Sequence, residues 1–200
     1  MQRSGLITRS YNWLMPCAFL TQSIRDFIAN LSPFNLAFNQ NIFPYYRDDI
    51  PVQLLPAMNI YIARVQSKGK YYYKYYFTNI DIYIPQETTH KRTDDMSHAV
   101  LSWLDMVFKR PDFQNYISRY NPGVMDVAGV NYTTQAYNHK KLDTKYDVQV
   151  IGYGLQVKFD RMIWAEELIN KYGVSPSNID MIFEFSYLRQ AVPNTIYSNV

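Results

Sequence analysis

Residues 71–86 read YYYKYYFTNIDIYIPQ, a run of aromatic and β-branched side chains that changes character with a period of two. Such alternation is typical of a strand with one buried face. The even-numbered positions from Ile80 to Ile84 are all isoleucine, whereas the odd-numbered positions from Tyr75 to Tyr83 are aromatic or polar. Toward Lys74 the isoleucine face becomes polar. We therefore expect a strand that extends beyond its core and projects its tyrosines there.

The segments around this strand alternate between extended and helical patterns. Residues 53–66 form a second extended run, and the turn SKGK, with Gly69, joins the two runs into a predicted hairpin. Further strands are predicted at 123–140, 145–160 and 180–190, and helices at 20–31, 94–110, 111–120 and 161–172. This order predicts an α+β fold, an antiparallel sheet with long hairpins and helices packed on one face.

Local signals set the expected boundaries of these elements. Thr93 or Asp94 is the expected N-cap of the helix at 94–110. Asp160 is the expected N-cap of the helix at 161–172, and Gly173 is expected to end it. In that last helix, apolar positions expected to face inward are Ile163, Leu168, Ile169 and Tyr172. We expect an N-terminal arm at 1–18, a single domain at 19–190 and a C-terminal tail at 191–200.

Composition narrows the classes of protein to which the chain can belong. Charged residues make up 18% and the net charge is only +3, far below that of dedicated nucleic-acid binders. A single cysteine, Cys17, excludes an internal disulfide and a cysteine-based zinc site, and is expected to be a small buried thiol. No run of 18 apolar residues is present, so no membrane span is expected.

Candidate catalytic or metal-binding groups are few. The densest cluster is His90, Asp94, Asp95 and His98, where Asp94 and His98 would share a helix face. We favour a solvated helix start over a metal or acid–base site, since no second cluster supplies further ligands. Asp48–Asp49 and His139 are interpreted as turn residues. We predict no catalytic residue, no metal and no cofactor, and therefore not an enzyme.

The aromatic strand has three possible interpretations. Rings with nearby lysines suit base stacking, tyrosine also packs well on a pleated core surface, and tyrosine is enriched at protein interfaces. Because the surroundings are Asn-rich and weakly charged, we favour a protein interface. The predicted interface residues lie in the strand and in the preceding loop: Lys70, Tyr71, Tyr73, Lys74, Tyr75, Phe77, Tyr45, Tyr46 and Arg47.

The order of elements resembles the tail-terminator and tail-completion proteins of tailed bacteriophages. The resemblance is carried by an amphipathic helix, a strand beginning LLPAMNIYI, a return strand NIDIYIP, a helix and a late FEFSY strand, over residues 20–190. It implies a virion protein assembled in the host cytoplasm as a ring, usually a hexamer. That ring would cap the tail tube and join it to the head connector, with DNA passing through its channel. The alternative function is a single-stranded nucleic-acid-binding module using Tyr71, Tyr73 and Tyr75.

Overall fold

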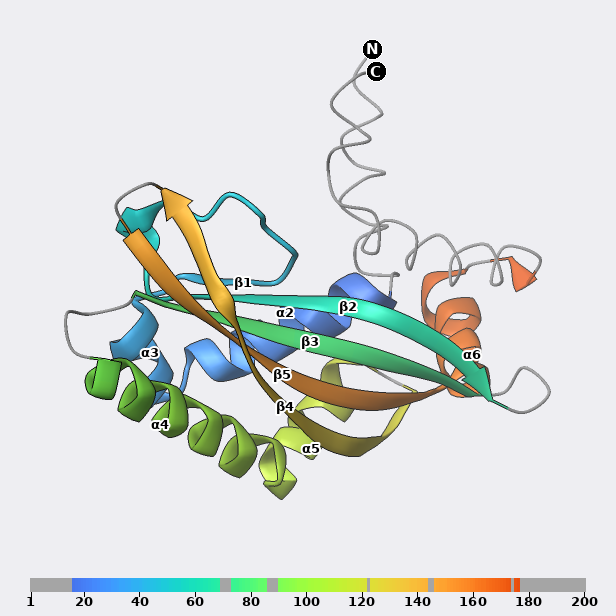
Figure 1. Cartoon of the computed structure of the whole chain (residues 1–200). Coiled ribbons are helices and arrows are strands. Elements are labelled where there is room, and N and C mark those ends of the chain that lie inside the picture. Colours follow the sequence, from blue (N-terminus) through green and yellow to red (C-terminus); the bar gives the residue numbers. More distant parts are fainter. Residues whose placement is uncertain are drawn as a thin grey trace, which may run out of the picture.

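The computed structural model describes residues 16–68, 73–85, 90–121, 123–143, 146–173 and 175–176, and all structural statements concern these ranges. Helices alternate with strands along the chain (Figure 1). The elements in order are α2 (Pro16–Ala29), α3 (Ser32–Phe38), β1 (Ile42–Phe43), η1 (Val52–Leu54), β2 (Ala57–Lys68), β3 (Tyr73–Pro85), α4 (His90–Phe108), α5 (Pro111–Tyr120), β4 (Val124–Asp143), β5 (Tyr146–Asp160) and α6 (Arg161–Tyr172).

The strands form one five-stranded sheet in the order β1-β2-β3-β5-β4. The β2–β3, β3–β5 and β4–β5 pairs are antiparallel, and the short β1 runs parallel to β2. The sheet is therefore mixed but mainly antiparallel, and the predicted α+β class is confirmed. In β1 the residues that pair with β2 in the parallel sense are Ile42 and Phe43. Among the described strands, the departure from the expected antiparallel pattern is therefore confined to this edge of the sheet.

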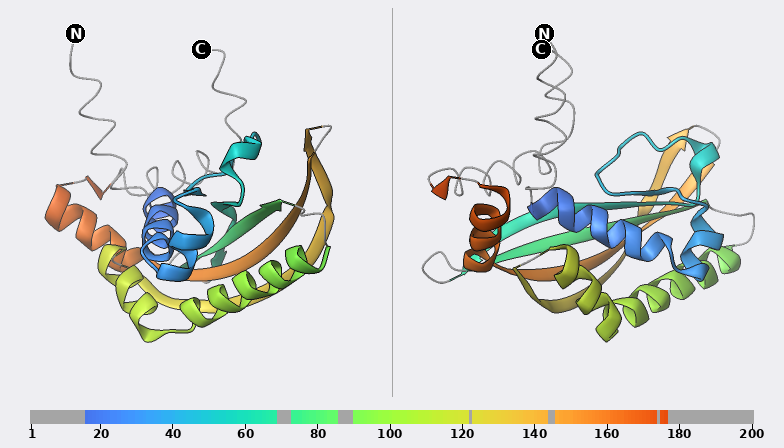
Figure 2. Two further views of the ribbon diagram at one scale, coloured as in Figure 1. Left: turned by 90° about the vertical axis from the view of Figure 1, so that its left-hand side faces the viewer. Right: turned by 180° about the vertical axis from the view of Figure 1, so that it is seen from behind.

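The helices and one face of the sheet share a single apolar core. Cross-strand neighbours on that face include Ile60, Ile80 and Tyr153, which are all buried. They belong to one cluster with buried residues of α2 to α6, such as Ile24 and Leu104. Seen from behind, α2 lies across the strands in Figure 2. The even-numbered isoleucines of β3 thus face the core, as their alternation predicts.

The expectation that β3 extends beyond its core is wrong. The strand pairs with β5 from Tyr73 to Pro85, and β2 pairs with its other edge, so it is the central strand of the sheet. Tyr76 is 1% exposed and Lys74 is 6% exposed. The core continues at this end because the Tyr76 ring lies 4.8 Å from that of Phe159, which in turn lies 5.7 Å from that of Trp164. Helix α6 therefore covers the polar end of the isoleucine face.

Several predicted boundaries differ from the observed ones. Helix α4 begins at His90, so neither Thr93 nor Asp94 is its N-cap, and α2 begins at Pro16, inside the predicted arm. Cys17 is fully buried in the core, as expected of a small thiol. The predicted strand at 180–190, the tail at 191–200 and residues 1–15 lie outside the described residues.

The sequence correctly predicts the N-cap of helix α6 but not which of its side chains are buried. Asp160 Oδ1 accepts hydrogen bonds from the backbone N–H groups of Met162 (2.9 Å) and Ile163 (3.3 Å), so the predicted cap is confirmed. Of the four residues predicted to face inward, Ile163 and Ile169 are exposed, the side chains of Leu168 and Tyr172 are outside the described part of the structure, and Trp164 is buried instead. The Trp164 ring packs against that of Phe159 with centroids 5.7 Å apart, so this residue marks the buried side of α6, and Ile163 and Ile169 lie away from that side.

A second, smaller apolar cluster lies on the other side of the sheet. It comprises Ile50, Ala57, Tyr83 and Val148, from the loop before η1 and from three strands. The left view of Figure 2 shows the curved β4–β5 pair rising on the side of the sheet away from α4. None of the described helices combines the length and the apolar character that crossing a bilayer requires.

Candidate interaction surface

The side of the sheet opposite the helices carries an array of aromatic and polar side chains, which we call the open face. Its side chains come from the three central strands: Tyr61 and Arg64 on β2, Tyr73, Tyr75, Phe77, Asn79 and Asp81 on β3, and Lys158 on β5. Arg64 is exposed and the others are half-buried. The buried apolar residues of the described α-helices belong to the core on the other side.

Two cations lie over aromatic rings at one end of the open face. The guanidinium carbon of Arg64 is 4.1 Å from the centroid of the Phe77 ring. Lys158 Nζ lies 4.4 Å from the centroid of the Tyr73 ring. Both contacts are within the range of cation–π attraction, so the cations hold the rings in place and give this end of the face a positive character.

The other end of the open face is acidic and hydrogen-bonded. The hydroxyl of Tyr61 donates to Asp81 Oδ2 at 2.9 Å and accepts from Asn79 Nδ2 at 3.5 Å. Burial, together with the charge of Asp81, raises the pKa of Tyr61 above its ordinary value. The phenol therefore stays protonated as a donor, and the face is divided into a cationic aromatic end and an anionic end.

The loop between β1 and η1 lies against the anionic end. The Tyr46 ring packs edge-on against that of Tyr61, with centroids 4.9 Å apart. A hydrogen bond to Asp48, burial and the nearby carboxylates raise the pKa of Tyr46 to about 12. Asn59 Nδ2 donates to the backbone oxygen of Arg47 at 2.8 Å, which ties the loop to β2.

The structure brings together some predicted interface residues and separates others. Tyr73, Tyr75 and Phe77 share the open face, and Tyr46 reaches its far end through Tyr61. Arg47 is engaged with Asp49 and Phe43, and Tyr45 is 47% exposed beside Phe43. Lys70 and Tyr71 lie outside the described residues.

Lys74 does not belong to this surface. It lies on the helix-covered side of β3, opposite Phe159, because its even-numbered position places it with the core residues. The cations of the open face are instead Arg64 and Lys158, which the sequence reasoning missed. Lys158 could have been found from the alternation of β5, whereas Arg64 follows a bulge between Ile62 and Arg64 that shifts the register.

The residues considered for catalysis lie in separate parts of the fold, and the side chains of His90 and His139 are not described. Asp94, Asp95 and His98 lie in the first half of α4, where Asp94 and His98 are exposed. Within the described ranges, no three His, Cys, Asp or Glu side chains gather as metal ligands. Asp49 pairs with Arg47 at 3.3 Å in the loop, as expected of a local turn contact.

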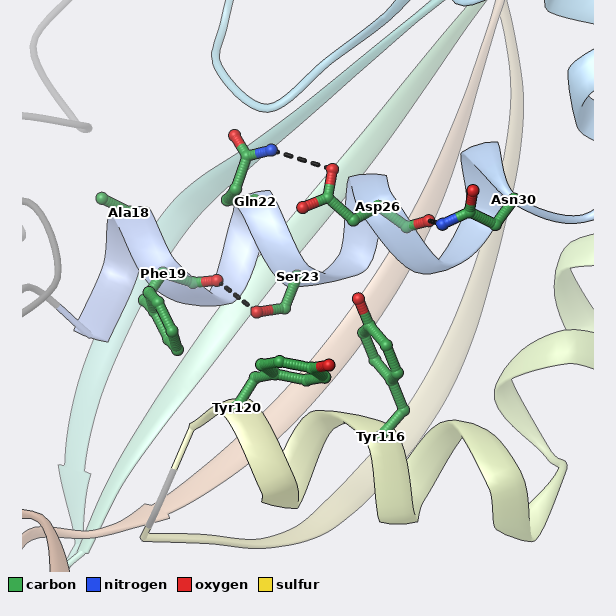
Figure 3. Close-up of a pocket in the computed structure, with 8 residues that line it drawn as sticks. All are labelled: Ala18, Phe19, Gln22, Ser23, Asp26, Asn30, Tyr116 and Tyr120. Carbon is green, nitrogen blue, oxygen red and sulfur yellow. Dashed lines mark hydrogen bonds between the residues drawn. The ribbon is translucent and has the colours of Figure 1, made fainter.

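A hollow of about 650 Å³ lies between α2 and α5 (Figure 3). Tyr116 and Tyr120 extend from α5 toward α2, where Phe19 and Ser23 point toward them, and Gln22 and Asp26 also line the hollow. Gln22 Nε2 donates to Asp26 Oδ1 at 2.9 Å. The Ser23 hydroxyl donates to the Phe19 carbonyl at 2.7 Å, so its proton is engaged by the backbone. Among the described residues that line the hollow there is no histidine or cysteine, and the chemistry of these residues is that of a polar contact between two helices.

A scan against protein families finds no match to this chain, and a search of curated proteins finds none either.

Proposed function

We propose that this chain is a structural subunit of a bacteriophage virion, which assembles as a homo-oligomeric ring at the tail or neck. In this role it caps the tail tube and joins it to the head connector, and it carries no catalytic site. The order of helix α2, strands β2 and β3 and helix α4 supports the proposal, since it matches the element pattern of the tail-terminator resemblance.

The observation that carries the proposal is the open face. A five-stranded sheet with helices on one side leaves Tyr73, Tyr75 and Phe77 on the other. Aromatic rings with polar tips are enriched where proteins meet, because they offer rigid apolar area that tolerates water at its edge. A face of this composition is therefore suited to a neighbouring subunit or a neighbouring virion protein.

The mass of the assembly in solution tests the proposal. We expect the full chain to form a ring of defined mass, visible as an annulus by electron microscopy. Tyr75→Glu, which places a charge in the middle of the aromatic array, should weaken contact with a tail or neck component or between copies. Asn115→Asp on the exposed side of α5 is the matched control. A chain that stays monomeric at high concentration and does not bind tails would contradict the proposal.

A second candidate function follows from the cations of the open face. Arg64 and Lys158 flank the rings of Phe77 and Tyr73, and such a combination can stack bases and contact phosphates. Under this alternative, single-stranded DNA binds with an affinity that falls steeply with salt, and Tyr73→Ala or Lys158→Ala abolishes it. Absence of salt-dependent binding by the wild-type chain would exclude the alternative and leave the ring proposal intact.

A further inference from the structure

Helix α6 exposes an apolar stripe although its other side is anchored in the core. Met162 is 51% exposed, Ile163 45% and Ile169 37%, whereas Trp164 is 2% exposed. At 100° per residue, Met162, Glu166 and Ile169 lie at the i, i+4 and i+7 positions of one face. An apolar stripe on one face of a helix is the pattern by which helices dock into hydrophobic grooves of other proteins.

A groove of about 540 Å³ lies between the start of α3 and the second half of α4. Its wall is apolar and aromatic, with Leu31, Phe34, Trp103 and Met106. The Phe34 and Trp103 rings meet edge to face at 5.9 Å, which makes the wall rigid, and Met106 is 58% exposed. Methionine adapts its shape to apolar partners, so this wall can accept the side chains of a docking helix.

The charged residues that line the groove are two cations, Lys109 and Arg110, and one carboxylate, Asp105. Lys109 contacts Asp105 at 2.6 Å and Arg110 contacts Asp112 at 2.7 Å, yet their side chains are 64% and 57% exposed. A lysine ammonium has three donors and an arginine guanidinium five, so both retain donors for a further carboxylate.

We propose that α6 of one copy docks into the α3–α4 groove of the next copy. Met162, Ile163 and Ile169 complement the apolar wall, and Glu166 complements Lys109 and Arg110 at the edge. In Figures 1 and 2 α6 lies at one end of the molecule and α3 toward the other, so the stripe and the groove do not overlap. Two different surfaces that meet form a heterologous contact, which closes into a ring when the rotation between copies permits.

This inference rests on the proposed ring and names the contact that would build it. Crosslinking tests it directly, since the chain's own Cys17 is fully buried and does not compete. A chain carrying both Met106→Cys and Met162→Cys should, on mild oxidation, give a ladder of covalent oligomers that ends at the ring number. Each single variant should stay uncrosslinked, and an equal mixture of the two should give dimers only. Dimers from Met162→Cys alone would overturn the proposal, because α6 would then pair with itself.

Variants of the two surfaces provide an independent measurement. Ile163→Asp should raise the apparent dissociation constant of the assembly about tenfold or more, as for a central interface residue, while the exposed Asn115→Asp control leaves it unchanged. Glu166→Arg should weaken assembly, and adding Arg110→Glu in the same chain should restore it. Helical content measured by circular dichroism should be unchanged in all of them.

The outcomes separate this contact from the ring itself. A ring that persists in Ile163→Asp, with no ladder from the double-cysteine chain, overturns the α6–groove contact and leaves the proposed function standing. A wild-type chain that is monomeric and gives no ladder overturns both. A groove occupied by the chain's own segment would also overturn the contact, and it would appear as slow thiol labelling of Met106→Cys in the monomer.

Discussion

The hydroxyl of Tyr61 on β2 donates a hydrogen bond of 2.9 Å to Oδ2 of Asp81 on β3, across the open face of the sheet. The two residues are not directly opposite each other, since Tyr61 pairs with Asn79 and Asp81 with Asn59. The bond is therefore diagonal, and it fixes both side chains at the anionic end of the face. Because the acceptor is a carboxylate, this hydrogen bond is stronger than one between two neutral groups.

Removing this donor should destabilise the protein modestly. We expect Tyr61→Phe to lower the free energy of unfolding by about 1 to 2 kcal/mol, since a half-buried carboxylate loses a donor. Urea denaturation measures the change. In the Asp81→Ala background the same substitution should cost clearly less, because the partner is already gone. Equal costs in the two backgrounds would show that the bond contributes nothing.

The pKa of Tyr46 predicts a pH dependence of stability at alkaline pH. Its pKa is about 12 in the folded protein, against 10.0 for the unperturbed phenol. Between these values the folded chain binds more protons than the unfolded chain, so the free energy of unfolding falls as the pH rises from 10 toward 12. Asp48→Asn should lower the pKa of Tyr46, seen by tyrosinate absorbance against a Tyr46→Phe reference. Asp49→Asn is the matched control and should leave that pKa unchanged.

Trp164 should be the residue of α6 on which stability depends most. It is 2% exposed and continues the ring contacts of Tyr76 and Phe159. We expect Trp164→Ala to cost about 3 to 5 kcal/mol, as for other large buried aromatic residues. Its neighbour Ile163 is 45% exposed, and Ile163→Ala should change stability by less than about 0.5 kcal/mol. Similar costs for the two, measured by urea denaturation of the monomer, would contradict the assignment of the buried side of α6.

Gly123 should tolerate no side chain. Its φ is +99°, and a Cβ would lie 2.8 Å from the backbone oxygen of Asp160 and 3.2 Å from Trp164. Gly123→Ala should therefore cost about 2 kcal/mol or more, from backbone strain and steric overlap together.

Gly173 provides the matched control for that substitution. Its φ is also positive, +64°, but a Cβ there meets nothing within 4 Å. Gly173→Ala should cost only the conformational strain, about 1 kcal/mol. The difference between the two unfolding free energies measures the steric overlap together with the larger backbone strain at φ +99°, and a zero difference would exclude both.

Much of the fold could be predicted because its signals are local. Alternation along 74–84 correctly assigned the isoleucines of β3 to the core, and Asp160 and Gly173 marked the limits of α6. The start of α4 was misplaced because Thr93 and Asp94 resemble a cap, although the helix begins earlier, at His90. Propensity at helix ends is weak compared with tertiary packing, which decides how far the first turn continues.

The candidate surface was predicted only in part. The sequence identified Tyr73, Tyr75 and Phe77 as one face of a strand, but it included Lys74 and missed Lys158 and Arg64. Long-range pairing brings Lys158 to within 4.4 Å of the centroid of the Tyr73 ring. The alternation of β5 indicates on which side of its strand Lys158 lies, but the pairing of β5 with β3 joins segments far apart in the chain and leaves no local pattern.

The alternation of side chains by itself determined that this chain forms an α+β fold and which side of β3 faces its core. Tertiary structure alone decided that β3 is the central strand and that Trp164 extends the core over Tyr76 and Phe159. The physical reason is that periodicity reports which side of an element avoids water. Which other element covers that side depends on the register between strands and the close packing of distant side chains.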